Sequence, residues 1–440
     1  MPAALSPSES SRPALAIALR EQMPALANKT YFNYGGQGPL PEASLAAITA
    51  AFRTIQELGP FSGAVWPYVS RTTEALRSRL ASAAWLGVGP QRLAFTENVT
   101  AGCVLPLWGL PWQAGDQLLL SDAEHPGVVA ACRELARRQQ LELCLLPVAD
   151  LRGDTDGPAE AEAACQRTAA AVLARLEQAL TPRTRLVALS HLLWNSGQIM
   201  PITAVADRLA QHPRRPWLLV DAAQSLGAIP VAEAAAAADI YACTGHKWCC
   251  GPEGLGVVAL SERLLEQASP TLIGWRSLAG EHSGSSAFHT DARRFEVATS
   301  CIPLFAGLDR SLQLLEAVGS AEQRLQAIRE RSARLWHGLR QIGLRQIGLQ
   351  QRDSQQHGLE PLLQVEPPAG LVSFFPGGSG PQAGRRADAL VQDLGARGLW
   401  LRTLEDPHCV RACTHVFTTE AEVDQLLQAV AAWMAAPALG

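Results

Sequence analysis

Short apolar runs alternate with amphipathic segments through the first 290 residues of the chain. The runs lie at residues 92–96, 117–121, 186–190, 217–220 and 239–243, and their central positions are apolar. Strands that are buried on both faces of a parallel sheet have this composition, and helices between such strands are typical of α/β folds. The pattern therefore predicts a large α/β domain with a mainly parallel sheet over residues 41–290.

The last third of the chain has a different pattern. A long helix is expected at about 307–341, followed by short strands and a closing helix at 418–434. This order predicts a smaller α+β domain over residues 291–440. Residues 1–40 contain one short amphipathic piece, and we expect them to form an N-terminal arm that joins the small domain.

Bulk composition describes an ordinary globular protein. The 440 residues are 48% hydrophobic and 18% charged, with a formal net charge of −4. There is no basic excess to attract nucleic acid, and no apolar run is long enough to span a membrane. Ten cysteines without framework spacing, in a sequence without a visible secretory signal, favour reduced thiols and a cytoplasmic location.

Two of the expected strands end beside residues that can carry chemistry. Asp221 closes the run at 217–220, and Lys247 lies in a turn after the run at 239–243. Open α/β sheets bind ligands at this edge. An acid together with a lysine favours pyridoxal phosphate chemistry, in which the lysine binds the cofactor and the acid keeps its ring nitrogen protonated. Taken singly, each would more simply be a strand-end acid or a surface lysine.

Other loops at the same edge offer groups that suit a phosphorylated cofactor. A helix opens at Val99 and Thr100, where free N–H groups and the helix dipole favour a phosphate. His125 follows the run at 117–121 and could stack on an aromatic ring, or simply cap the next helix. Asn195 or Ser196 could hydrogen-bond the ring oxygen of the cofactor, or serve only the turn in which they lie.

An irregular loop near the N-terminus is a further candidate. Residues 31–41 contain three glycines and two prolines, so neither a helix nor a strand is expected there. The backbone at Gly36 could approach a substrate closely, and Gln37 offers a side-chain amide. A plain connecting loop explains the same residues equally well.

Three short motifs in these segments resemble the class V aminotransferase family, the fold-type I pyridoxal phosphate enzymes that include the cysteine desulfurases. They are Asp-x-x-Gln at 221–224, Gly-His-Lys at 245–247 and Glu-His at 124–125. The resemblance extends from about residue 30 to residue 430. It implies the fold-type I architecture, pyridoxal 5'-phosphate as cofactor and an amino acid as substrate.

The resemblance also implies roles for single residues at the cofactor. Lys247 matches the Schiff-base lysine, Asp221 the partner of the pyridine nitrogen, and His125 the residue that stacks on the ring. Gln224 matches the residue that contacts the phenolic oxygen. The implied phosphate ligands are Thr244 and His246, which join Thr100, and Thr299, which reaches the phosphate of a neighbouring subunit.

The resemblance further implies a homodimer with shared active sites and a substrate pocket formed partly by arginines. Arg411 matches the arginine that binds the substrate carboxylate, which suits a guanidinium fork. Arg402 matches a second family position, although a surface ion pair is a close alternative. Trp275 could line the substrate pocket, but a core tryptophan is equally plausible.

The spacing of the two arginines departs from that of the desulfurases. In the most similar desulfurase subgroup, a mobile loop with a nucleophilic cysteine lies between the counterparts of Arg402 and Arg411. Here only residues 403–410 separate them, and Cys409 lies almost on the arginine strand, where it cannot swing. The sequence is more similar to the cystine C–S lyase branch, in which Lys247 would remove the Cα proton and a sulfur group would leave from Cβ.

We therefore expect a cyst(e)ine C–S lyase that forms pyruvate, ammonia and a persulfide or sulfide, with a sulfur acceptor, such as one for iron–sulfur clusters, as a possible partner. The alternatives are a desulfurase that uses Cys409, an epimerase or aminotransferase of the same family, and a non-catalytic cofactor-binding scaffold. No metal site is expected, because the histidines and cysteines at 408–415 lack the spacing of paired zinc ligands.

Overall fold

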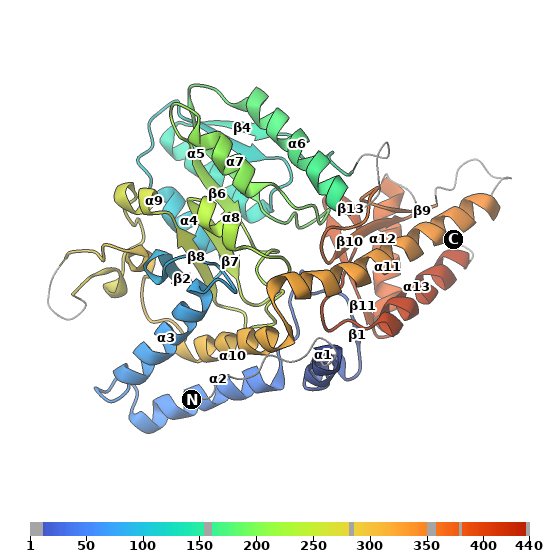
Figure 1. Ribbon diagram of the computed structural model, residues 1–440, viewed down its shortest axis with the longest axis horizontal. Coiled ribbons are helices and arrows are strands. Elements are labelled where there is room, and N and C mark those ends of the chain that lie inside the picture. Colours follow the sequence, from blue (N-terminus) through green and yellow to red (C-terminus); the bar gives the residue numbers. More distant parts are fainter. Residues whose placement is uncertain (1–11, 154–160, 281–285, 350–357, 378–380, 437–440) are drawn as a thin grey trace.

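A seven-stranded sheet is the centre of the molecule (Figure 1). The computed structural model describes residues 12–153, 161–280, 286–349, 358–377 and 381–436. The strand order is β2-β8-β7-β6-β5-β3-β4, and only β8 is antiparallel to its neighbours. The strands are β2 (Leu93–Thr96), β3 (Gln117–Ser121), β4 (Glu142–Leu146), β5 (Thr184–Ser190), β6 (Trp217–Asp221), β7 (Ile240–Thr244) and β8 (Gly256–Leu260).

Helices cover both faces of this sheet because successive residues of its inner strands point to opposite faces and are apolar on each. Leu118 and Leu186 pack on one face, whereas Leu119 and Val187 pack on the other. The first face is covered by α4 (Val99–Trp108), α5 (Pro126–Gln139) and α9 (Glu262–Gln267). The second is covered by α6 (Ala161–Ala179), α7 (Ile202–Ala210) and α8 (Ala232–Ala237). The expected α/β class and the mainly parallel sheet are confirmed.

A second, antiparallel sheet lies in the C-terminal part of the chain, drawn in orange and red on the right of Figure 1. Its order is β12-β13-β10-β9, with β9 (Leu359–Pro361), β10 (Leu371–Pro376), β12 (Arg402–Glu405) and β13 (His408–Cys413). The helices beside it are α11 (Ala321–Leu349), α12 (Pro381–Ala396) and α13 (Glu420–Ala435). Their apolar residues share one core cluster with β10 and β13.

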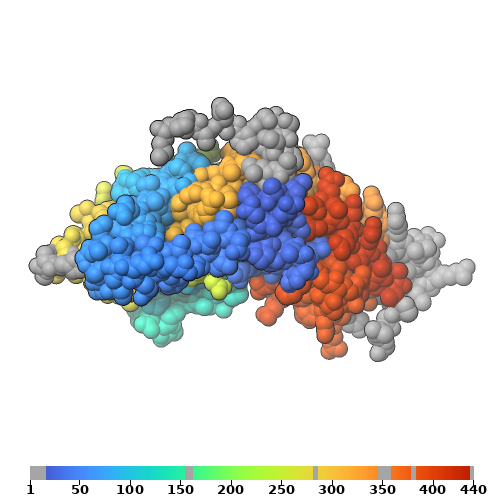
Figure 2. Space-filling view, turned by 90° about the horizontal axis from the view of Figure 1, so that it is seen from below, coloured from blue at the N-terminus to red at the C-terminus, as the bar shows by residue number. Residues whose placement is uncertain are grey.

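The N-terminal segment contacts this C-terminal part, as Figure 2 shows for the blue and red residues. It contains α1 (Arg12–Glu21), η2 (Pro24–Leu26) and β1 (Thr30–Tyr31), and β1 pairs in parallel with β11 (Leu399–Trp400). The Arg20 guanidinium donates to the Phe417 carbonyl at 2.8 Å and lies 2.6 Å from the Glu422 carboxylate. Residues 1–11 lie outside the described part of the chain.

The single long helix expected at about 307–341 is wrong, because the chain forms α10 (Ile302–Val318) and then α11. Ser320 and Gln323 form a capping pair, with the Ser320 N–H donating to Gln323 Oε1 at 3.0 Å. Arg324 donates to the carbonyls of Leu315 and Gly319, which end α10. The Ser-x-x-Gln spacing was a readable signal for this break.

Helix α10 packs beside α2 (Glu42–Leu58) and α3 (Trp66–Ala81), at the bottom of Figure 1. Its buried residues join the core cluster of the large sheet rather than the small one. The domain bounds at residues 40 and 290 stay predictions, and α10 lies on the large-sheet side of the molecule. Within the described ranges, no helix combines the length and apolarity needed to cross a membrane.

Candidate active site

A cavity lies at the carboxyl ends of β3, β5 and β6, where an open α/β sheet binds ligands. The residues that line it are Val99, Thr100, His125, Ser190, Leu192, Trp194, Asp221, Ala223, Gln224 and Lys247. Six of these were predicted from the sequence: Val99, Thr100, His125, Asp221, Gln224 and Lys247. A second cavity, at the opposite edge of the sheet, contains Asp239 and Arg263, which neutralise each other as an ion pair.

Lys247 and Asp221 face each other across the cavity and perturb each other's ionisation. Burial lowers the pKa of Lys247 to about 8, and Arg411 and Arg402 act in the same direction while Asp221 opposes them. Burial raises the pKa of Asp221. Two interactions partly offset this rise: the Ala223 N–H donates to Oδ1 at 2.9 Å, and the Lys247 charge favours the ionised form. A lysine with a lowered pKa has a larger neutral fraction near pH 7, so its amine can act as a nucleophile or base.

His125 stands at the start of α5 as its N-cap. Its Nδ1 accepts from the Gly127 N–H at 3.2 Å, so the proton of the neutral imidazole is on Nε2. Burial lowers the pKa of His125, which keeps the ring neutral at pH 7. Trp194 meets this ring edge to face, with centroids 5.7 Å apart. A neutral aromatic wall is thereby held at one side of the cavity.

Gln224 is fixed from two directions. Its Nε2 donates to the Gly35 carbonyl at 2.9 Å, and its Oε1 accepts from the Trp248 indole N–H at 2.8 Å. A Cβ at Gly35 would lie 3.0 Å from Gln224 Oε1 and 3.0 Å from Arg411 Nη2. The glycine-rich loop therefore packs directly against site residues, which explains why position 35 lacks a side chain.

Four of the residues expected around the phosphate lie on two neighbouring segments. Val99 and Thr100 form the first turn of α4, whose N-terminus is capped by Asn98 through the N–H of Ala101 at 2.9 Å. Thr244 Oγ1 lies 2.7 Å from His246 Nδ1. Burial lowers the pKa of His246 to about 4, with the Lys247 charge acting in the same direction.

Arg411 and Arg402 lie side by side in the small sheet, because their Cα atoms pair between β12 and β13. Arg411 is 1% exposed, and its Nη1 donates to the Trp194 carbonyl at 2.7 Å. Its Nε and Nη2 meet no hydrogen-bond acceptor within the described part of the chain. These two nitrogens form one edge of the guanidinium, the edge that binds a carboxylate with two parallel hydrogen bonds. Arg402 is exposed.

Cys409 lies inside β13 between these arginines and the turn. Strand β12 ends at Glu405 and β13 begins at His408, so a two-residue turn joins them. The Cys409 side chain is buried in a cluster with Leu362, Phe375 and Leu404, and burial raises the pKa of its thiol to about 12. A buried thiol with a raised pKa is a poor nucleophile.

Several predicted residues do not reach the cavity within this chain. Asn195 directs its amide to the Asp406 carbonyl at 3.3 Å, while the neighbouring Trp194 lines the cavity instead. Gly36 packs against Asn33, and Gln37 is exposed. The sequence offered Asn195 or Ser196 but did not identify Trp194, because successive side chains of a turn point in different directions.

Trp275 and Thr299 do not line the cavity, and both follow α9 in the chain. Trp275 begins η4 (Trp275–Ser277) and meets Trp66 edge to face at 6.2 Å. Thr299 is exposed with φ of 30°, a backbone region that β-branched residues rarely adopt. Such strain persists only where the surroundings hold it in place.

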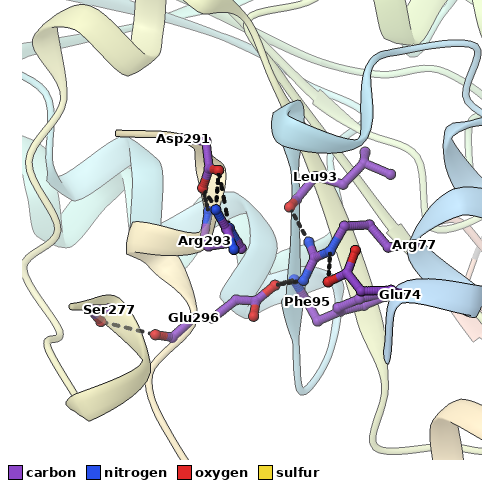
Figure 3. A network of polar contacts seen from close by, with 8 residues as sticks. All are labelled: Glu74, Arg77, Leu93, Phe95, Ser277, Asp291, Arg293 and Glu296. Carbon is purple, nitrogen blue, oxygen red and sulfur yellow. Dashed lines mark hydrogen bonds and ion pairs between the residues drawn. The ribbon is translucent and has the colours of Figure 1, made fainter. Parts of the chain in front are cut away.

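Figure 3 shows what holds this segment. Glu296 follows η5 (Ala292–Phe295), and its Oε1 accepts from Arg77 Nη2 at 2.8 Å and from the Phe95 N–H at 3.0 Å. Its carbonyl accepts from Ser277 Oγ at 2.9 Å, which ties η4 to η5. Both Arg77 and Glu296 are buried, so the pair anchors the Thr299 segment to α3 and β2.

Sequence reasoning missed four cavity residues: Ser190, Leu192, Trp194 and Ala223. All four lie at or just after the ends of β5 and β6. The position of Ser190 at a strand end was visible in the sequence, but nothing in the sequence distinguished it from an ordinary turn residue. Glu124, buried below the cavity, was seen only as the neighbour of His125.

Comparisons with known proteins identify the family. The family model for class V aminotransferases matches residues 67–361. An isopenicillin N epimerase from Amycolatopsis lactamdurans is 30% identical over 93% of this chain and 96% of its own. One from Streptomyces clavuligerus is 33% identical over 58% of this chain and 59% of its own. A solved structure of the cystine C-S lyase C-DES with cysteine persulfide is 41% identical, with a TM-score of 0.81, over 93% of this chain and 99% of that chain.

The chain belongs to the class V aminotransferase family, and its cofactor is pyridoxal 5'-phosphate. A variant of the same C-S lyase carries glycine covalently linked to this cofactor, at 42% identity and a TM-score of 0.81 over 94% of this chain and 98% of that chain. The residues present fit such a group, because Lys247 and the buried acid Asp221 line the cavity. Arg411 is tied to the cavity residue Trp194 through its carbonyl and keeps one edge without a hydrogen-bond partner.

Proposed function

We propose that this enzyme is a cyst(e)ine C–S lyase, which cleaves the Cβ–S bond of cystine or cysteine to give pyruvate, ammonia and a persulfide or sulfide. The observation that carries the proposal is the two-residue turn between Arg402 and Arg411, with Cys409 buried inside β13. A desulfurase needs a thiol that moves to the substrate sulfur, and this hairpin has no length for such a loop. The similarity to the cystine C-S lyase structure supports the same reaction.

Four residues of the site then have a role in the reaction. Arg411 binds the substrate carboxylate through its free Nε and Nη2, and thereby orients the Cα–H bond. Lys247 holds the cofactor at rest and, when released, takes the Cα proton as general base. Asp221 keeps a proton on the ring nitrogen of the cofactor, and His125 stacks on the ring. When bound, the cofactor supplies an electron sink that stabilises negative charge at Cα.

The cleavage itself needs no further protein nucleophile. The Cα–H electrons form the new double bond, and the Cβ–S bond breaks with its electron pair on sulfur. The leaving group is a persulfide anion from cystine and a hydrosulfide anion from cysteine. The persulfide anion is the weaker base and leaves more easily, so cystine is the better substrate. Trp194, which lines the cavity beside His125, gives the departing sulfur a polarisable aromatic wall.

One assay separates the rival reactions. The purified enzyme is incubated with cystine and, separately, with cysteine, and pyruvate, alanine and sulfane sulfur are measured together. Pyruvate formed in step with persulfide, faster from cystine, supports the lyase. Alanine with protein-bound persulfide would overturn it in favour of a desulfurase.

An epimerase is the second candidate, because the Amycolatopsis epimerase is similar over almost its entire length. Epimerisation needs a proton returned to the opposite face of Cα. Besides Lys247 and Asp221, His125 is the titratable side chain that lines the cavity among the described residues, and burial lowers its pKa, which disfavours it as a proton donor at pH 7. The same incubation in deuterated water tests it. Deuterium in recovered, racemised amino acid without pyruvate would support the epimerase.

We further propose that the enzyme is a homodimer in which Thr299 completes the phosphate site of the partner. Apolar side chains are exposed near this segment: Phe61, Leu272, Ile273 and Phe288. Trp66 connects Phe61 to Trp275 through edge-to-face contacts, so these residues form one surface. Light scattering of the wild type should give a mass twice that of one chain, and Phe61→Glu should reduce the measured mass to that of a single chain.

A sulfur-acceptor protein is the further partner that we propose, and transfer of persulfide from the enzyme to that protein tests it.

A further inference from the structure

Glu124 is a buried acid that the proposed reaction does not use. It lies between β3 and α5, is 6% exposed, and sits beside the cavity rather than in its lining. Its Oε1 accepts from Ser121 Oγ at 2.5 Å and from the Ser190 N–H at 2.7 Å. Its Oε2 lies 2.7 Å from Ser190 Oγ. All of these partners are neutral, so none compensates a negative charge as a cation would.

A charge of the same sign acts on Glu124. Asp221 is the Cα partner of Ser190 in the neighbouring strand, and its charge opposes ionisation of Glu124. Two buried carboxylates this close are not both ionised without a large cost. Burial, aided by Asp221, raises the pKa of Glu124 to about 7, although the serine hydrogen bonds act against it.

The other titratable groups near this pair do not change the balance in favour of an ionised Glu124. Cys132 on α5 and Cys103 on α4 are buried thiols whose pKa values are raised, so they stay neutral. Lys247 is the cation that favours an ionised Asp221, and His125, neutral at pH 7, acts in the same direction only when it is protonated. The Lys247 charge therefore favours ionisation of Asp221 and leaves Glu124 as the acid that keeps its proton.

We propose that Glu124 is a positioning residue that carries a proton at slightly acidic pH and donates it in a hydrogen bond to Ser190 Oγ. The Ser190 hydroxyl, which lines the cavity beside Asp221, is then free to direct its own proton towards the bound cofactor. Of the two carboxyl groups, Asp221 would then carry the negative charge that a bound cofactor needs near its ring nitrogen. The arrangement serves any reaction of this cofactor, so it stands even where the C–S lyase proposal fails.

Glu124→Gln tests the protonation state, because an amide reproduces the hydrogen bonds of a neutral acid. The amide oxygen accepts from Ser121 and the Ser190 N–H, and the NH₂ donates to Ser190 Oγ. We expect the variant to bind the cofactor with wild-type absorbance and to keep kcat within about threefold at pH 7. If Glu124 must be ionised, kcat should instead fall by about tenfold or more, and the proposal is overturned.

Two readouts on the cofactor-free protein are independent of activity. The infrared difference spectrum of wild type minus Glu124→Gln at about pH 6 should contain the carbonyl band of a protonated carboxyl group. Glu134→Gln, an exposed acid on the same helix paired with Arg137, is the matched control and should give no such band. Absence of the band in the Glu124 spectrum overturns the proposal.

The pH dependence of Tm gives the second readout. The pKa of Glu124 is raised from 4.5 to about 7 in the folded protein, so the folded state binds more protons between these values. Wild type therefore loses stability as the pH rises through this window, and Glu124→Gln does not. The Tm of the variant should rise relative to wild type across the window; a constant difference contradicts the proposal.

Ser190→Ala should lower kcat with little change in KM, since it removes the acceptor of the Glu124 proton but no substrate contact.

Discussion

The two sheets supply site residues in different ways. The large parallel sheet places Asp221 at the last position of β6, and Lys247 and His125 in turns just beyond strand ends. Local hydrogen bonds set the backbone after Asp221 and at His125. The small antiparallel sheet places Arg411 within a strand, buried between neighbouring strands. Groups in turns can shift when a ligand binds, whereas a group within a strand is fixed. The comparison indicates that the large sheet supplies the groups that act on the cofactor and on protons, and that the small sheet supplies the fixed arginine that orients the substrate.

The largest effect is expected at the lysine of the large sheet. The chain contains only two lysines, Lys29 and Lys247, which makes the test unusually clean. Lys247→Ala should abolish the visible absorbance of the lysine-bound cofactor and reduce kcat by roughly 10²- to 10⁴-fold, because it removes the general base. Borohydride reduction followed by mass spectrometry should label Lys247 and not Lys29. Unchanged absorbance in Lys247→Ala would refute the assignment, and Lys29→Ala is the control.

Arg411 should show the next largest effect, on substrate rather than on cofactor. Arg411→Lys keeps the charge but loses the two-bond edge, and a charged hydrogen bond contributes about 1.5–3 kcal/mol. We expect kcat/KM to fall by roughly 10- to 100-fold with the cofactor absorbance unchanged. Arg402→Lys, at the exposed position opposite in register, should lower kcat/KM by less than about fivefold. Equal effects of the two variants would contradict the proposed division between them.

A smaller effect concerns the stability of the cofactor-free protein. The pKa of Lys247 is lowered from 10.5 to about 8, so the unfolded chain binds more protons between these values. The contribution of Lys247 to stability therefore rises with pH over this window, and below it the cost of the buried charge is complete. The Tm of wild type relative to Lys247→Met should rise from about pH 8 to pH 10.5. A flat difference would show that the lysine is solvated in the folded protein.

The smallest effect is expected at the thiol of the small sheet. Cys409→Ala should leave pyruvate formation and sulfane sulfur release within about twofold of wild type, because the buried thiol does not meet the substrate. Mass spectrometry of wild type after turnover should find no persulfide on Cys409. Loss of sulfur release in this variant would revive the desulfurase and show that β13 opens during turnover.

The sequence by itself determined the α/β class, five of the seven strands of the large sheet, and the placement of Lys247, Asp221 and His125 at or after strand ends. Apolar strand patterns and groups at strand ends are local features, so they are readable without coordinates. It also placed the arginine spacing that argues against a mobile cysteine. Each of these features depends only on residues that are close together in the sequence.

Only the tertiary structure decided which side chains enter the cavity. Trp194 rather than Asn195 lines it because the amide of Asn195 pairs with Asp406, more than 200 residues away in the sequence. Glu124 became a candidate only when β5 brought Ser190 to its carboxylate. Side-chain direction in turns and the burial of a charge depend on partners distant in sequence, and local pattern carries no information about either.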